Sequence, residues 1–190
     1  MVRHTAFEVL YREYYVRVFG LCRRLLNFNE QAEDATQEVF MRAYRKFHKY
    51  DAERPFWQWI ATIANNHCID ILRQRNRTDV LFGDETTELE ELAAEDQPIL
   101  EHLIAYEDAD ALNDAIAALP DKYRIPLVLA YFNDSSYDDI AEQLELSRSH
   151  VGVLLLRAKK HLRETINTPT PLTPPTAPPT TNEASHGGTP

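Results

Sequence analysis

Residues 135–164 constrain the fold of this chain more than any other stretch, because they contain two helical patterns separated by a very short turn. Ser136 stands three residues before Asp139, a spacing typical of a capping box at a helix start. Two helices joined in this way predict a helix-turn-helix, whose second helix can enter the major groove of DNA. A plain helical hairpin is the alternative. The second helix would bury residues spaced i, i+4, i+7 and i+11, namely Val151, Leu155, Ala158 and Leu162.

Helical periodicity also runs through most of the remaining chain, which predicts an all-α protein. The patterns lie within residues 6–27, 29–48, 56–77, 106–119 and 121–131. Pro126 falls inside the last of them and can kink it.

Two segments lack this periodicity and divide the chain. Residues 78–105 are acidic and contain Pro98, which predicts a flexible linker. Residues 168–190 are mainly Pro and Thr, a composition that cannot bury a core and is predicted to be disordered. This tail is either a passive end or a regulatory arm. We therefore expect two small helical domains, 1–77 and 106–167, joined by the linker 78–105.

The net charge of −10 is unevenly distributed along the chain. Residues 78–110 contain twelve Asp or Glu and no Lys or Arg, so the flanking segments are near neutral and carry local basic clusters. This distribution favours selective, assisted contact with DNA over tight autonomous binding through phosphate neutralisation.

Several classes of protein are disfavoured by what the sequence lacks. No apolar run reaches the length of a membrane span and the N-terminus has no signal-peptide pattern, so we expect no membrane insertion. Cys22 and Cys68 are predicted to be buried thiols in a reducing cytoplasm. The five glycines form no phosphate loop, and the seven histidines show no metal-ligand spacing. We expect no enzymatic activity, no cofactor and no metal.

Two helices carry polar residues in ordered patterns. In residues 29–48, charged residues recur every four positions, an arrangement that a solvated face ordinarily explains. In residues 56–77, aromatic rings stand at the start, polar side chains follow along one face, and arginines close the helix. Rings, amides and guanidinium groups in this order suit an unstacked DNA strand. Alternatively, the tryptophans belong to the core and the arginines merely favour the helix C-terminus; both interpretations stay open.

The order of these pieces resembles a bacterial sigma factor of the extracytoplasmic-function class, the minimal branch of the sigma-70 family. Residues 31–47 are similar to region 2.2 of that family, residues 56–77 to regions 2.3 and 2.4, and residues 118–164 to region 4. Together, and in this order, the three motifs are highly specific.

The resemblance implies a function for each motif. Region 2.2 would dock on the β′ clamp helices of RNA polymerase through Asp34, Gln37, Glu38, Met41 and Arg42. The −10 promoter element would be recognised and melted by Phe56, Trp57, Trp59, Thr62, Asn66, Asp70, Arg73 and Arg75. The loop 49–56 would capture a flipped base. The −35 element would be bound by Ser147, Arg148, Ser149, His150, Val153, Arg157 and Lys160.

The implied protein is a bacterial, cytoplasmic sigma factor that binds core RNA polymerase and directs promoter-specific initiation without catalysis of its own. Its partners would be the β′ clamp helices, the β flap and promoter DNA, and an anti-sigma factor is usual in this class. Two alternatives are a stand-alone helix-turn-helix regulator and a sigma-like protein-interaction module. The aromatic cluster Phe56, Trp57 and Trp59 favours the sigma factor over the stand-alone regulator, because a protein that binds only duplex DNA has no use for a base-flipping loop.

Five positions of the helix-turn-helix depart from the family pattern. Glu145 stands where glycine is common, His150 replaces a common Thr, and apolar residues occupy 152–154, where polar ones are frequent. We hypothesise that this helix relies on phosphate contacts and DNA shape more than on base-edge hydrogen bonds. Strong base-by-base penalties at −35 that vanish in Arg148→Ala would refute this. Thr62 also replaces a frequent basic residue, which weakens the phosphate grip of region 2.

Overall fold

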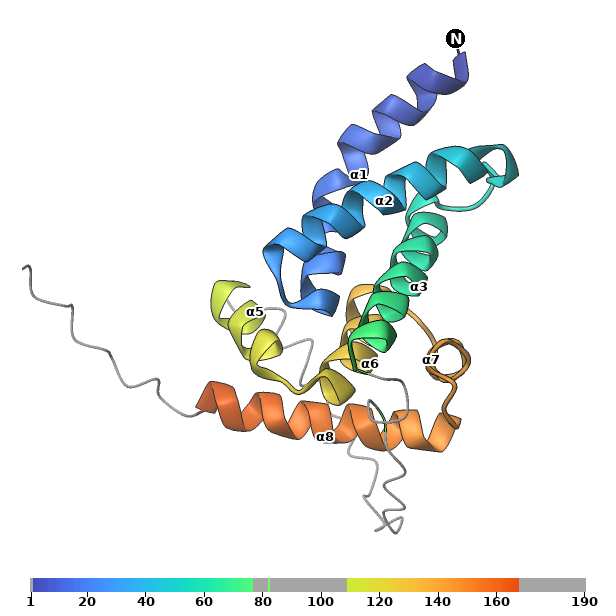
Figure 1. Ribbon diagram of the computed structural model, residues 1–190. Coiled ribbons are helices and arrows are strands. Elements are labelled where there is room, and N and C mark those ends of the chain that lie inside the picture. Colours follow the sequence, from blue (N-terminus) through green and yellow to red (C-terminus); the bar gives the residue numbers. More distant parts are fainter. Residues whose placement is uncertain (1, 77–81, 83–108, 168–190) are drawn as a thin grey trace, which may run out of the picture.

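The structure, a computed structural model, describes residues 2–76, 82 and 109–167. Every element within these residues is helical, which confirms the all-α expectation. Figure 1 shows an N-terminal bundle of α1–α3 beside a C-terminal group of α5–α8. The predicted linker and tail lie outside the described residues. The elements are α1 (Val2–Leu26), α2 (Asn29–Lys46), the 3₁₀ helix η1 (Phe47–Lys49), α3 (Phe56–Asn76), α5 (Ala109–Ala118), α6 (Asp121–Phe132), α7 (Tyr137–Leu144) and α8 (Arg148–Asn167).

The N-terminal bundle closes because each of its helices turns an apolar stripe inward. In α2 the buried stripe contains Ala35, Val39 and Ala43, spaced four residues apart. Small side chains on this stripe let α2 lie close to α1 and α3, which contribute larger ones. The buried apolar residues of α1 are Phe7, Val18, Leu21, Cys22, Leu25 and Leu26, and those of α3 are Phe56, Trp57, Ile60, Ala61, Ala64, Cys68, Ile69 and Leu72.

The two cysteines meet inside this bundle. Cys22 of α1 and Cys68 of α3 are fully buried free thiols, as the sequence predicted. Their thiols hydrogen-bond each other, and this bond together with burial raises the pKa of Cys68. Cys68 is therefore held in the protonated form, and the pair serves as packing between α1 and α3.

The C-terminal group is organised around α6. Seven consecutive residues of α6, 123–129, are buried, because this helix is enclosed by α1, α7 and α8. The helix runs through Pro126 without interruption. The predicted apolar face of α8 is confirmed, since Val151, Leu155, Ala158 and Leu162 are all buried.

The helix-turn-helix is formed by α7 and α8, and its local signals are confirmed. The Ser136 hydroxyl accepts the Asp139 amide at 3.1 Å, while the Asp139 carboxylate accepts the Ser136 amide at 3.0 Å, which completes a capping box. Glu145 ends α7 in the left-handed region at φ 59°, where glycine would be unstrained. Ser147 caps α8 by accepting the amide of His150 at 3.2 Å.

Replacing Ser136 by Ala is expected to lower the free energy of unfolding by about 0.5–2 kcal/mol, because the Asp139 amide loses its acceptor and the Asp139 carboxylate loses a hydroxyl donor. Urea denaturation followed by circular dichroism measures this change. Hydrogen bonds from Ser136 lower the pKa of Asp139, so their stabilisation is present above the unfolded-state pKa and is lost as pH falls through the folded-state value. A cost that does not diminish in acid would contradict this account.

The two helical groups are packed against each other, a contact that the sequence did not reveal. Arg124 of α6 is only 2% exposed and donates to the carbonyl oxygen of Leu25, at the end of α1, at 3.3 Å. The side-chain amide of Asn27 donates to the Ala117 carbonyl at 2.9 Å. The Leu25 carbonyl at the C-terminal end of α1 is thus satisfied by Arg124, and the Ala117 carbonyl at the end of α5 is satisfied by Asn27.

Candidate polymerase and nucleic-acid interface

The outer face of α2 carries the five residues expected to bind polymerase. Asp34, Gln37 and Met41 are exposed, while Glu38 and Arg42 are half-buried. All five lie opposite the buried stripe of this helix. Arg42 Nε donates to Glu38 Oε1 at 2.7 Å, and this hydrogen bond lowers the pKa of the Glu38 carboxyl. The face is therefore polar at both ends, with the thioether of Met41, 50% exposed, between them.

An aromatic groove of about 560 Å³ adjoins this face, and Gln37 and Met41 belong to both. Tyr11 and Tyr44 line it and are about two-fifths exposed, at 39% and 42%. Neither tyrosine was among the site residues predicted from the sequence. The groove extends the outer face of α2 onto α1. Its lining residues are His4, Phe7, Glu8, Tyr11, Gln37, Phe40, Met41, Tyr44 and Arg45.

The three aromatic residues at the start of α3 divide into two kinds. Phe56 is 4% and Trp57 7% exposed, so both rings belong to the core, in line with the packing alternative. Phe56 packs against Tyr14 with ring centroids 5.1 Å apart, and the guanidinium of Arg17 covers the Trp57 ring at 3.7 Å. α1 covers both of these rings, and their contact with DNA stays a prediction. Trp59 is half-buried.

The loop 49–56 stands on an aromatic base. Tyr50 lies 5.2 Å from Trp59 and stacks on Phe47 at 5.8 Å, measured between ring centroids. The Tyr50 hydroxyl donates to the Arg54 carbonyl at 2.6 Å, which closes the loop, and burial raises the pKa of that hydroxyl. Asp51, Glu53 and Arg54 form its exposed rim. The loop thus places the packed rings of Phe47, Tyr50 and Trp59 next to an exposed charged edge formed by Asp51, Glu53 and Arg54.

A polar stripe follows the outer side of α3. Thr62, Asn66 and Asp70 are all exposed, as expected for residues that read bases. Gln58 and Gln74 extend the stripe by one turn at each end and are also exposed. The sequence analysis missed these two glutamines, although their i, i+4 spacing from the others was visible.

The arginines at the end of α3 contact the C-terminal group instead of lying free. Arg73 donates to the Gln143 carbonyl at 3.2 Å and pairs with Glu145 at 2.8 Å. Arg75 pairs with Asp121 at 2.6 Å. The structure therefore separates the predicted −10 residues into an open stripe and two occupied arginines.

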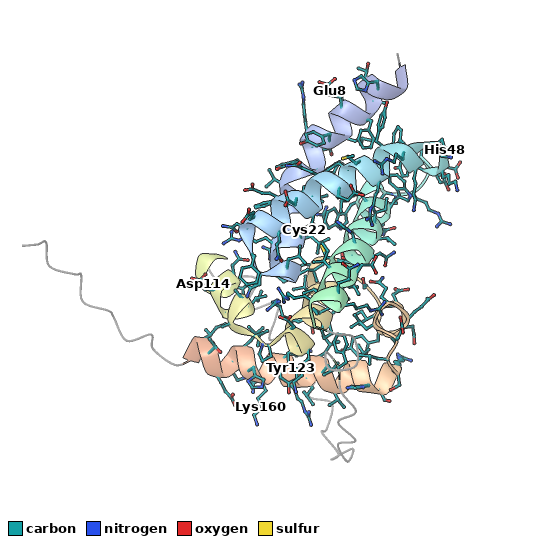
Figure 2. All side chains as sticks on the ribbon, viewed as in Figure 1. Glu8, Cys22, His48, Asp114, Tyr123 and Lys160 are labelled. Atoms are coloured by element: carbon teal, nitrogen blue, oxygen red, sulfur yellow. The ribbon has the colours of Figure 1, made fainter. Side chains whose placement is uncertain are left out.

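The predicted −35 residues run from Ser147, just before α8, to Lys160 on that helix. Ser147, Arg148, Ser149 and Lys160 are exposed, and Figure 2 shows Lys160 projecting away from the bundle. His150, Val153 and Arg157 are half-buried. Arg148 lies 3.7 Å from Asp138, and both side chains are more than two-thirds exposed, so this pair constrains Arg148 little.

Among the described residues, no group of three or more His, Cys, Asp or Glu side chains is arranged to hold a metal ion. No helix within the same residues combines the length and apolar character needed to cross a membrane.

Family models match both helical groups. The model for Sigma-70 region 2 matches residues 10–78, and the model for Sigma-70 region 4 matches residues 109–162. The first match covers α2 and α3 with most of α1, and the second covers α5–α7 and most of α8.

Curated relatives align along most of the chain. The ECF RNA polymerase sigma factor SigW of Bacillus subtilis (strain 168) is 30% identical over 165 residues, covering 84% of this chain and 88% of SigW. The ECF RNA polymerase sigma factor SigM of the same organism is 27% identical over 160 residues, covering 84% of this chain and 94% of SigM.

Two solved structures share the fold. The sigma factor RpoE in complex with the anti-sigma factor NepR, from Bartonella quintana, aligns with a TM-score of 0.57 at 19% identity, covering 87% of this chain and 99% of that one. CnrH in complex with the cytosolic domain of CnrY aligns with a TM-score of 0.52 at 20% identity, and the alignment covers 88% of this chain and 91% of that one. With both domain models matched and SigW aligned over most of its length, the chain belongs to the extracytoplasmic-function (ECF) class of RNA polymerase sigma factors and directs the initiation of transcription.

Proposed function

We propose that this sigma factor docks on core RNA polymerase through the outer face of α2 and contacts the promoter through two separate surfaces. The polar stripe of α3 and the loop 49–56 act at the −10 element, and the first half of α8 acts at −35. The β′ clamp helices are the partner of α2, and the β flap is the partner of region 4. Here region 2 denotes α1–α3 and region 4 denotes α5–α8. The protein works in the bacterial cytoplasm by positioning its partners and catalyses no reaction itself.

The exposure of the α3 stripe carries this proposal. Thr62, Asn66 and Asp70 stay open to solvent, while the residues next to them along α3 are buried or half-buried. Amide and carboxylate groups can hydrogen-bond the edges of bases once a strand is unpaired. A helix that served only to pack the bundle would not need an amide and a carboxylate aligned on its outer side.

Trp59 is the ring of the α3 cluster that we assign to an extruded base. It is half-buried and borders Tyr50 at the base of the loop 49–56. Aromatic faces hold flipped or unstacked bases in a sequence-tolerant way. Phe56 and Trp57 support this arrangement from the core.

An anti-sigma factor is a further partner that we propose. One of the similar structures is a sigma factor bound to an anti-sigma factor, and it shares the fold of this chain. A protein that covered the outer face of α2 would block the polymerase, because both would compete for Met41 and its polar neighbours.

The double variant Asn66→Ala/Asp70→Ala is expected to open the −10 element about 10- to 100-fold less effectively, because each lost base-edge contact costs ~1–3 kcal/mol and such losses only partly add. Permanganate reactivity of unpaired thymines in the complex with core polymerase measures the melted strand. Gln31→Ala, an exposed residue of α2 outside the docking set, serves as the matched control. Binding to core polymerase should not change in either variant. Normal permanganate reactivity in the double variant would refute the assignment of the stripe.

A further inference from the structure

The turn inside the loop 49–56 is closed by polar contacts of its own. The amide of Arg54 donates to the Asp51 carbonyl at 3.1 Å, and the amide of Glu53 donates to Asp51 Oδ1 at 3.1 Å. The Arg54 guanidinium also lies 3.7 Å from the Asp51 carboxylate, although both side chains are more than half exposed. These contacts fix the shape of residues 51–54, but they do not attach the turn to the helical bundle.

Tyr50 attaches this turn to the bundle. Its backbone amide donates to the Phe47 carbonyl at 3.2 Å, at the end of η1. Its side-chain hydroxyl spans the turn and donates to the Arg54 carbonyl at 2.6 Å. That carbonyl stands directly before Pro55, which has no N–H and favours an extended backbone at the preceding residue. One side chain thus ties the last residue of the turn to the point where the turn begins.

The ring of Tyr50 is itself held by three other rings. Phe47 is stacked on it with centroids 5.8 Å apart and an interplanar angle of 13°, and Phe56 meets it edge-on at 5.4 Å. Trp59 lies 5.2 Å away, tilted by 41°. Phe47 belongs to η1 and the other two rings to α3, so they flank the loop on both sides. Tyr50 therefore cannot move without disturbing packed rings at both ends of the loop.

These contacts give Tyr50 a different task from Trp59. A ring that stacks on a base must offer a free face, whereas Phe47 covers one face of Tyr50 and the Arg54 carbonyl engages its hydroxyl. We propose that Tyr50 is a positioning residue, whose hydroxyl holds the loop 49–56 in its base-binding shape before DNA binds, while Trp59 contacts the base. This inference rests on the proposed function of the loop.

A loop that already has its bound shape holds a base more tightly than a loose one. Ordering a mobile segment on binding costs free energy, and a hydrogen bond already made in the free protein removes part of that cost. Burial raises the pKa of the Tyr50 hydroxyl, so this group is protonated at neutral pH and can donate. The hydroxyl thus increases the fraction of chains whose loop is ready to accept the base.

Hydrogen exchange in the free chain tests whether the hydroxyl holds the loop. Tyr50→Phe keeps the ring and removes the bond to the Arg54 carbonyl. The protection factors of the Glu53 and Arg54 amides are expected to fall about two- to tenfold in this variant, since one net hydrogen bond is lost. Nuclear magnetic resonance at these two amides measures them. Unchanged protection factors would overturn the proposal.

Two variants serve as controls for the exchange measurement. Arg54→Ala removes the exposed ion pair with Asp51 but leaves the backbone carbonyl in place, so its effect should be smaller than that of Tyr50→Phe. Tyr137→Phe removes the hydroxyl of a tyrosine in region 4 that is 37% exposed, and should leave the loop unchanged. An effect of Arg54→Ala equal to or larger than that of Tyr50→Phe would show that the ion pair, and not the hydroxyl, holds the loop.

Base capture is measured with forked promoter DNA and the assembled polymerase. Each base of the single-stranded −10 element is replaced in turn by an abasic site, and the resulting loss of affinity is the base penalty at that position. The wild-type chain should show a large penalty at one position, which identifies the captured base. In Tyr50→Phe this penalty should shrink about two- to tenfold, because the loop is less often in its base-binding shape. Tyr137→Phe should keep the wild-type penalty.

The base penalty separates positioning from a general structural role. A variant that had only lost stability would bind intact and abasic DNA less well by the same factor, so its base penalty would not change. A wild-type penalty in Tyr50→Phe therefore overturns the role of Tyr50 alone. No penalty at any position in the wild-type chain overturns the proposed function of the loop, and with it the part of Tyr50 in base capture.

Discussion

Met41→Glu is expected to weaken binding to core RNA polymerase by about 30- to 1000-fold, which corresponds to ~2–4 kcal/mol for a central interface residue. Met41 is the large apolar side chain of the docking set, and half of its surface is exposed. It lies where the outer face of α2 meets the aromatic groove. Binding of the polymerase would remove water from a carboxylate at this position and would hold it beside the like charge of Glu38. No opposite charge would offset these two costs.

Val9→Glu is the matched control for this change. Val9 is 59% exposed on α1 and does not line the aromatic groove, so the same apolar-to-acidic substitution there should leave affinity within about fourfold. Fluorescence anisotropy with labelled sigma factor and purified core polymerase measures the dissociation constants of both variants. Wild-type affinity in Met41→Glu, or equal losses in the two variants, would show that polymerase docks elsewhere.

Leu154→Ala is expected to lower the free energy of unfolding by about 2–5 kcal/mol, because it removes a fully packed side chain and leaves a cavity. Leu154 is 2% exposed and packs beside Leu155 in the core beneath α8. Alanine is the best helix former, so the loss would not come from a weaker helix. This prediction concerns a position where the family more often has a polar residue.

The neighbouring residue provides the comparison. Val153 is half-buried on the side of α8 proposed to face DNA, so Val153→Ala should cost no more than about 1 kcal/mol. Urea denaturation followed by circular dichroism gives both values. If Val153→Ala destabilised the protein more than Leu154→Ala, the assignment of the Val153 side of α8 to the DNA-facing surface would be wrong.

Local signals in the sequence were enough to predict most helices of the fold. The Ser136–Asp139 box and the Ser147 cap involve residues three positions apart, so nothing distant was needed to recognise them. Helix faces could be predicted in the same way, as the buried Val151, Leu155 and Ala158 show. Boundaries were less accurate: α1 begins at Val2, although periodicity placed its start near residue 6.

Long-range packing decided what the sequence left open. Arg124 lies within a helix whose pattern gave no reason to expect a buried guanidinium, and its partner Leu25 is 99 residues away. The same holds for Phe56 and Trp57, which Tyr14 and Arg17 of α1 cover, whereas Trp59 remains at the edge. A pattern along one helix cannot show which neighbouring helix will cover a given side.

The arginines of α3 show a different limit. Their number and position at a helix end were visible, and either phosphate binding or helix-end stabilisation explained them equally well. The structure adds a third role, since Arg73 and Arg75 join the two regions through Glu145 and Asp121. The helical periodicity of α3 could not have predicted that the carboxylates of residues 121 and 145 lie at the end of this helix.

Run-off transcription with purified core polymerase and a library of genomic templates tests the central claim most directly. The account predicts that the full chain yields discrete transcripts that core polymerase alone does not make, and that Met41→Glu abolishes them while Val9→Glu does not. A chain that binds duplex DNA but yields no transcript from any template would contradict it.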